Sequence, residues 1–151
     1  MATLFLICGL PGSGKTTLAR QIEAERPALR LCPDEWIAAI MADPTNTAEL
    51  DRLRDPVEQI QWDLARRSLA LGLDVVLEFG FWSRAERDRF RGEAEALGAQ
   101  VELHYLQASR EELRARLARR NENLPPGTFP VTAAQLDLWM SWFEPPAPEE
   151  F

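Results

Sequence analysis

Lysine is almost absent from this sequence of 151 residues, because 16 of its 17 basic residues are arginine and only Lys15 is lysine. Arginine and lysine differ in shape and hydration, so a single lysine in such a chain calls for a specific explanation. The basic residues are also outnumbered by 24 acidic ones, which gives a formal net charge of −7. A net negative surface repels phosphate backbones and argues against a long nucleic acid as partner, unless a local basic cleft overrides it.

Cysteines and long hydrophobic runs are also scarce. Cys8 and Cys32 are the two cysteines, too few for a disulfide scaffold and without the spacing of a zinc site. The longest apolar stretch, residues 2–8, is too short to span a bilayer. No basic region precedes it and no small-residue cleavage site follows it, so it does not have the form of a signal peptide. We therefore expect a reducing, cytoplasmic location without membrane association.

Length and composition predict one folded domain, since 46% of the residues are hydrophobic and 27% are charged. Strand-like segments at 3–8, 29–32, 74–79 and 101–106 alternate with helical patterns at 15–25, 35–41, 49–71, 84–97, 110–121 and after Thr132. Asp34 is predicted as the N-cap of the second helix, and Ser109 with Glu112 as a capping box. The alternation predicts an α/β fold with helices on both faces of a parallel sheet. Ligands bind such sheets beyond the carboxyl ends of the strands, at the loops after Cys8, Cys32 and Glu78.

Residues 9–17, GLPGSGKTT, complete the phosphate-loop pattern G-x-x-x-x-G-K-[ST], and a predicted strand and helix flank them as the motif requires. The glycines let backbone N–H groups converge on phosphate oxygens, and the helix adds its positive N-terminal end. In such loops the lysine contacts the β- and γ-phosphates and the hydroxyl residue is a ligand of Mg²⁺. The predicted nucleotide-binding residues are Gly9, Leu10, Pro11, Gly12, Ser13, Gly14, Lys15, Thr16 and Thr17, with Thr16 also on the metal.

Two classes of nucleotide protein are disfavoured by what surrounds this motif. A GTPase needs a guanine-binding element such as N-K-x-D, and Lys15 is the only lysine. An oligomeric ATPase motor usually needs a much longer chain. A compact kinase that transfers the γ-phosphoryl group of ATP to a small acceptor remains the favoured class.

The sequence resembles the small P-loop kinases, a group that includes polynucleotide 5′-hydroxyl kinases, chloramphenicol phosphotransferase, zeta-toxin-type kinases, gluconate kinases and AAA-like ATP-binding proteins. The resemblance covers nearly the whole chain. It rests on GLPGSGKTTLAR at 9–20, which is highly specific, and on PDEW at 33–36, residues 72–91 and EELRARLARRN at 111–121, which are moderately specific. It implies MgATP as cofactor and a three-layer α/β/α fold with strand order 2-3-1-4.

The domain organisation that follows is a P-loop kinase domain over residues 1–143, with a lid segment at about 114–131, and a Pro-rich tail at 144–151. The family usually has a fifth strand, and this chain ends about where that strand would begin. The strand is either missing or supplied by another subunit or a longer natural chain. An exposed sheet edge would favour dimers, and the sequence leaves monomer and homodimer open.

Two acidic residues match the family's functional positions. Asp34 stands where the family places a carboxylate that binds the acceptor hydroxyl and takes its proton, and capping of the helix is the alternative. Glu35 is the second candidate for the base. Glu78 ends its strand as a Walker-B acid would, which implies a role through Mg²⁺-bound water or at the acceptor. The family has Asp there, so the role of the longer Glu78 stays open, and an ordinary strand-end acid is the alternative.

Several arginines also match family positions. Arg116 and Arg120 lie on one helix face and match the paired arginines of the lid pattern L-x-x-R-x-x-x-R. The resemblance implies that they cover ATP and neutralise charge on the phosphoryl group, with Arg120 as the catalytic contact and Arg119 as a possible substitute. A solvated basic face is the alternative. Arg87 matches a further family arginine, with a surface ion pair as the alternative.

The acceptor is the least determined part of the prediction. Polynucleotide kinases of this type carry an arginine three residues after the catalytic aspartate, and here that residue is Ile37, which cannot hold a phosphate. Trp36, Ile37 and Trp82, with Asp34 and Glu78, are predicted to border a hydroxylated small molecule such as an antibiotic, a nucleoside or a metabolite. Core packing is the alternative for the apolar side chains. A polynucleotide 5′-hydroxyl kinase and a non-catalytic ATP-binding regulatory module are the alternative functions.

Overall fold

The apolar run near the N-terminus forms the central strand of a four-stranded parallel sheet in the computed structural model, which describes all 151 residues. This strand, β1 (Thr3–Cys8), is buried at every residue, which is why it has no polar alternation. The other strands are β2 (Ala28–Leu31), β3 (Asp74–Gly80) and β4 (Gln100–Tyr105), and the spatial order is β2-β3-β1-β4. The predicted fold class and strand order are confirmed, and the sheet has four strands.

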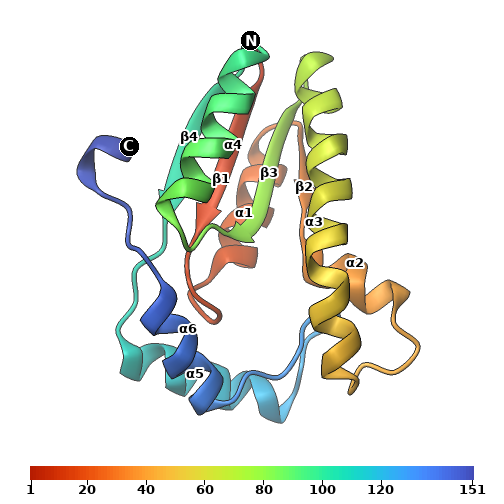
Figure 1. Ribbon diagram of the computed structural model, residues 1–151, viewed down its shortest axis with the longest axis vertical. Helices are drawn as coiled ribbons and strands as arrows, with labels where there is room; N and C mark the ends of the chain where they lie inside the picture. Colours follow the sequence, from red (N-terminus) through yellow and green to blue (C-terminus); the bar gives the residue numbers. More distant parts are fainter.

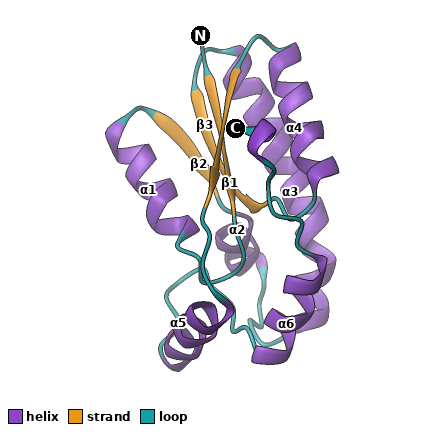
Figure 2. Cartoon of the chain, turned by 90° about the vertical axis from the view of Figure 1, so that its left-hand side faces the viewer, coloured by secondary structure: helices purple, strands orange, loops and turns teal.

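Helices cover both faces of the sheet, which completes three layers (Figures 1 and 2). One face carries α1 (Lys15–Glu25), and Phe5, Ile7 and Val76 of the sheet pack there against Ala19 and Ile22. The other face carries α3 (Thr47–Ala70) and α4 (Arg84–Ala96), and the larger core cluster lies beneath them. No helix combines the length and the apolar character needed to cross a membrane.

The remaining helices lie at or beyond the carboxyl ends of the strands (Figure 1). They are α2 (Pro33–Ile40), α5 (Arg110–Glu122) and α6 (Ala133–Trp142). Leu10 of the phosphate loop packs into a cluster with Leu113 and Leu117 of α5 and Leu136 of α6. The predicted lid segment is therefore docked on the loop that it is expected to cover.

Two local predictions need correction. Asp34 is not the N-cap of α2: the helix begins two residues earlier than expected, with Cys32 at the N-cap and Pro33 as its first residue. Proline suits that position because its missing N–H has no partner in a first turn, and Asp34 still favours the positive helix end from within it. Ser109 caps α5 by accepting from the Glu112 N–H at 3.1 Å, but the reciprocal half of a capping box is missing. The Glu112 side chain is turned toward Arg116 instead, at 3.9 Å.

The C-terminal segment, residues 144–151, packs back onto the domain and ends in a short 3₁₀ helix, η1 (Pro148–Glu150). Glu150 is buried, and its Oε1 accepts a hydrogen bond from Nε of the fully buried Arg87 at 2.7 Å. The ion pair of Arg87 is therefore an interior one and not the surface pair considered from the sequence. One buried charge pair joins the end of the chain to α4.

We predict that Glu150→Gln lowers the free energy of unfolding at neutral pH by about 3 kcal/mol, because the buried Arg87 then lacks its counter-charge. The hydrogen bond from Arg87 holds the pKa of Glu150 below its ordinary value of 4.5 in the folded protein. The contribution of the carboxylate is therefore complete above the ordinary value and is lost as the pH falls below it. Urea unfolding at several pH values should show the difference between wild type and variant shrinking from about pH 5 downward.

The matched control is Glu149→Gln, which makes the same change at an exposed neighbour that pairs with Arg84. It should leave the unfolding curve nearly unchanged. The prediction is wrong if the free energies of unfolding of wild type and Glu150→Gln differ by a constant amount down to about pH 3, because protonation of the Glu150 carboxylate should remove the difference.

Candidate active site

The phosphate loop joins β1 to α1 and is built to surround an anion. Gly14, immediately before α1, has a φ of +99° in the left-handed region, which a side chain would strain. A Cβ at Gly9 would lie 2.5 Å from Ser13 Oγ, so only glycine permits this close approach. Ser13 Oγ is itself buried without a hydrogen-bond partner. The first N–H groups of α1 and this hydroxyl are thus donors without partners in the helix, as a phosphate site requires.

Lys15 occupies the centre of the charged groups at this loop. Its Nζ donates a hydrogen bond to the Leu10 carbonyl at 3.0 Å. Burial lowers the pKa of Lys15 to about 8, with Arg120 adding to the shift and the carboxylates of Asp34 and Glu78 opposing it. The structure therefore brings Lys15, Arg120, Asp34 and Glu78 close enough for their charges to interact.

Thr16 and Glu78 lie in direct contact. Thr16 Oγ1 donates to Glu78 Oε1 at 2.6 Å, and the Glu78 side chain is 2% exposed. A hydroxyl and a carboxylate side by side at the phosphate loop are hard oxygen donors of the kind that Mg²⁺ takes from a protein, with phosphate oxygens and water completing its shell. The two residues predicted for the metal fit that ion.

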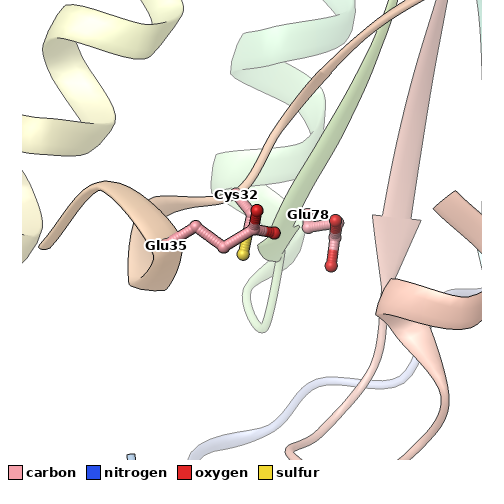
Figure 3. Close-up of side chains that lie close together, drawn as sticks. All are labelled: Cys32, Glu35 and Glu78. Carbon is pink, nitrogen blue, oxygen red and sulfur yellow. The ribbon is translucent and has the colours of Figure 1, made fainter. Parts of the chain in front are cut away.

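A second group of ligand atoms, from Cys32, Glu35 and Glu78, lies within 4.8 Å of one another (Figure 3). The guanidinium of Arg30 already bridges its two carboxylates: Nη1 donates to both, at 2.6 Å to Glu78 Oε2, and Nη2 donates to Glu35 Oε1 at 3.0 Å. Burial raises the pKa of the Cys32 thiol to about 12, which keeps it protonated. The cluster is therefore an ion-pair network and not a metal centre.

The same network bears on the second candidate for the catalytic base. Both carboxylate oxygens of Glu35 accept hydrogen bonds from Arg30, and these bonds hold the pKa of Glu35 below its ordinary value. A carboxylate stabilised in this way is a poor proton acceptor. Glu35 acts as a structural partner of Arg30.

Asp34, by contrast, keeps an oxygen free of hydrogen bonds. Its Oδ1 is buried and accepts none, although Nη1 of Arg54 lies 3.1 Å away as an ion-pair partner. Arg54 comes from α3 and was not found from the sequence, because it is 20 positions from Asp34 and matches no family motif. Asp34 therefore has a cation beside its buried oxygen, and because its side chain is 37% exposed the carboxylate remains accessible to a hydroxyl group.

The lid arginines both reach the site. Arg116 Nη1 donates to the Gly12 carbonyl in the phosphate loop at 3.3 Å. Arg120 Nη2 donates to the Phe129 carbonyl at 3.3 Å, while its Nε is buried without a partner. Burial lowers the pKa of Arg120, and Asp34 opposes that shift. Arg120 is therefore partly buried with a donor that has no partner, whereas Arg116 is exposed.

The apolar side chains predicted at the acceptor do not form one surface. Ile37 is fully buried in a cluster with Val57 and Phe129, so its assignment to the acceptor is corrected: it is a core residue that α2 turns toward α3. Trp36 is half-buried and packs against this cluster and the main core. Trp82 donates from Nε1 to the Gly9 carbonyl at 3.2 Å, so it supports the phosphate loop.

A groove between α3 and α4, of about 480 Å³, was not anticipated from the sequence. It is lined by Asp55, Glu58, Gln59, Trp62, Ala85, Glu86, Arg89 and Phe90. Burial raises the pKa of Glu58 to about 7, and Asp34 and Glu86 are among the charges that add to this shift. The groove is therefore lined by both carboxylates and aromatic rings.

Comparison with known proteins gives a family and a set of similar folds. The sequence matches the family model AAA_33, an AAA domain, over residues 4–146. No curated protein matches the chain. Kti12 from Chaetomium thermophilum, solved with ADP-AlF3, has a TM-score of 0.72 at 19% identity, over 97% of this chain and 82% of its own.

Two further solved structures are similar. A gluconokinase from Sinorhizobium meliloti has a TM-score of 0.66 at 20% identity, over 97% of this chain and 78% of its own. A chain of the Pnkp1/Rnl/Hen1 RNA repair complex has a TM-score of 0.71 at 20% identity, over 93% of this chain and 43% of its own. At these identities the likeness shows a shared fold.

The low pKa of Lys15 makes a prediction for nucleotide binding. The charged ammonium attracts phosphate, so ADP affinity should be highest below the Lys15 pKa of about 8 and fall as the pH rises through it. Between about pH 7.5 and 9.5 we expect a roughly tenfold weaker ADP affinity, because most Lys15 side chains lose their charge. Titration calorimetry with Mg²⁺ chelated measures this. Lys15→Gln should bind ADP weakly with no such pH dependence, and an equal pH dependence in that variant would contradict the assignment.

Proposed function

Because the chain belongs to this AAA domain family, a family of P-loop kinases, we propose that it transfers the γ-phosphoryl group of MgATP to a hydroxyl group of a small molecule. The observation that carries the proposal is the part-exposed carboxylate of Asp34 in the first turn of α2, whose charge acts on both Lys15 and Arg120. A base, a phosphate-binding ammonium and a second cation are what phosphoryl transfer to an alcohol requires.

Each residue has a distinct part in this mechanism. The Asp34 carboxylate accepts the proton of the acceptor hydroxyl while the hydroxyl oxygen attacks the γ-phosphorus, and the bond from that phosphorus to the β,γ-bridging oxygen breaks, so that ADP leaves. Lys15 and Arg120 offset the negative charge on the transferred group, in a site where burial strengthens their interactions. Thr16 and Glu78 would hold Mg²⁺, which neutralises charge between the phosphates. Arg116 closes the phosphate loop from the lid side.

Two features of the protein support a small acceptor. The groove between α3 and α4 has the size of a small-molecule site and combines aromatic rings with polar groups. The formal net charge of −7 disfavours a long polyanion. Cys8 and Cys32 are both free, which is in keeping with the reducing cytoplasm in which we place this activity.

One observation favours a second candidate, a polynucleotide 5′-hydroxyl kinase. The sequence has Ile37 where such kinases carry an arginine, but Arg54 of α3 brings a guanidinium 3.1 Å from Asp34 by another route. A guanidinium there can bind a phosphate of an acceptor strand. The structural neighbour from an RNA repair complex is in keeping with this candidate.

The first test is phosphoryl transfer from γ-labelled ATP with Mg²⁺ to a panel of hydroxylated antibiotics, nucleosides, sugars and a 5′-hydroxyl oligonucleotide. We predict label on one small molecule and a loss of about 100-fold or more in Asp34→Asn, which cannot take the proton. Asp63→Asn is the matched control, since Asp63 pairs with Arg66 at 2.6 Å on the exposed side of α3. Label on the oligonucleotide alone would favour the second candidate. Equal residual ATP hydrolysis in wild type and Asp34→Asn, with no transfer, would favour a non-catalytic ATP-binding module.

Arg54→Gln separates the two candidates further. If Arg54 orients the Asp34 base, as we propose for a small acceptor, kcat falls about tenfold and the acceptor KM stays constant. If it binds an acceptor phosphate, the KM rises and kcat holds. Arg52→Gln is the control, because Arg52 is exposed on the same helix and pairs only with Glu49. Wild-type values of both constants in Arg54→Gln would exclude both roles.

A further inference from the structure

The loop after β3 adopts a backbone that side chains rarely tolerate. Gly80 and Phe81 have φ values of +85° and +52°, and Phe81 is fully buried. A non-glycine residue keeps such a conformation only where its surroundings hold it. This loop touches the phosphate loop directly: the Gly80 carbonyl accepts from the Gly9 N–H at 3.0 Å, and Trp82 Nε1 donates to the Gly9 carbonyl at 3.2 Å. Residues 80–82 thus hold both peptide groups of the first residue of the phosphate loop.

The carbonyls of residues 81 and 82 are held by partners from three other parts of the chain. The Phe81 carbonyl accepts from Arg87 Nη1 at 2.7 Å and from Cys8 Sγ at 3.4 Å. The Trp82 carbonyl accepts from the Glu144 N–H at 2.8 Å, which comes from the C-terminal segment. Without these partners, the carbonyl of the buried Phe81 and that of its neighbour Trp82 would be left unpaired in a strained turn.

Arg87 is itself fixed by the end of the chain. Its Nε and Nη2 donate to the two carboxylate oxygens of Glu150 at 2.7 and 3.3 Å, and neither residue is exposed. The Ala147 N–H donates to Glu150 Oε2 at 2.6 Å, and Arg91 donates to the Glu150 carbonyl. Glu150 lies outside residues 4–146, the part that matches the family. A buried ion pair of this kind is a poor means of gaining stability alone, because desolvation offsets most of the attraction.

We propose that Glu150 and Arg87 are positioning residues for the phosphate loop. Glu150 holds Arg87, Arg87 holds the Phe81 carbonyl, and Trp82, the next residue, holds Gly9. Neither residue touches the nucleotide. Glu150 sets the direction of the Arg87 guanidinium, which fixes the Phe81 peptide and so aims the Trp82 indole at the Gly9 carbonyl. The inference rests on the proposed function only in requiring that the phosphate loop binds a nucleotide.

The test is a double-mutant cycle on ADP binding, measured by titration calorimetry well below the unfolding transition of every variant. Glu150→Gln and Trp82→Phe should each weaken ADP binding about five- to tenfold, the effect of one hydrogen bond. Trp82→Phe keeps an aromatic ring and removes the pyrrole part of the indole, which carries the N–H that holds Gly9, so it stays informative even if Glu150→Gln fails to fold. Glu149→Gln, the neighbouring change at an exposed carboxylate, should bind as wild type does.

The double variant distinguishes positioning from mere stability. If Glu150 and Trp82 act on Gly9 through the same chain of contacts, the double variant Trp82→Phe/Glu150→Gln should bind ADP about as weakly as either single variant. Glu150→Gln that is folded and binds ADP with wild-type affinity would overturn the inference, as would fully additive effects. Failure of Trp82→Phe to weaken binding would overturn it as well. Wild-type protein that does not bind ADP would overturn the proposed function and this inference together, whereas binding unchanged in all variants overturns only the inference.

Discussion

Arg30 joins the elements that surround the phosphate loop, and the geometry of the site depends on it. From β2 its guanidinium reaches Glu35 of α2, Glu78 of β3 and, at 3.2 Å, Glu23 of α1. By occupying Oε2 of Glu78, it leaves Oε1 to face Thr16 and the phosphate loop. By binding Glu35 it fixes the first turn of α2, from which Asp34 faces the same space as Lys15. Carboxylates packed this closely would repel one another strongly without the cation between them.

Hydrophobic contacts hold the lid segment, residues 114–131, against the rest of the domain. Leu117 of α5 lies against Gly12, where an added Cβ would come within 3.1 Å. Further along the lid, Phe129 is buried between α2 and α3 with Ile37 and Val57. The lid segment therefore spans from the phosphate loop to α2 and α3, and Arg120 lies between these two contacts in the sequence. The hydrogen bonds from Arg116 to Gly12 and from Arg120 to Phe129 add to these two apolar contacts.

Local patterns in the sequence determined much of this structure, and contacts across the fold determined the rest. The alternation of elements, the strand order implied by the family resemblance, and the phosphate loop follow from short contiguous segments, and the structure confirms the fold. Through-space pairs did not follow: Arg54 with Asp34, and Arg87 with Glu150, are 20 and 63 positions apart, and no periodicity relates them. Ile37 was misplaced because an apolar residue after a strand fits a ligand pocket and a core equally well. The packing of Phe129 against Ile37, which no local pattern predicts, assigns Ile37 to the core.

The burial of Lys15 has a consequence for the covalent chemistry of this protein. Apart from the N-terminal amine, Lys15 is the only primary amine in the chain, and its pKa of about 8 leaves an appreciable fraction unprotonated at neutral pH. An acylating agent or a modifying enzyme directed at lysine side chains therefore has a single target here, and that target is the phosphate loop. Because the other basic residues are arginine, the ε-amine of Lys15 in the phosphate loop is the one lysine amine that such a reagent can modify.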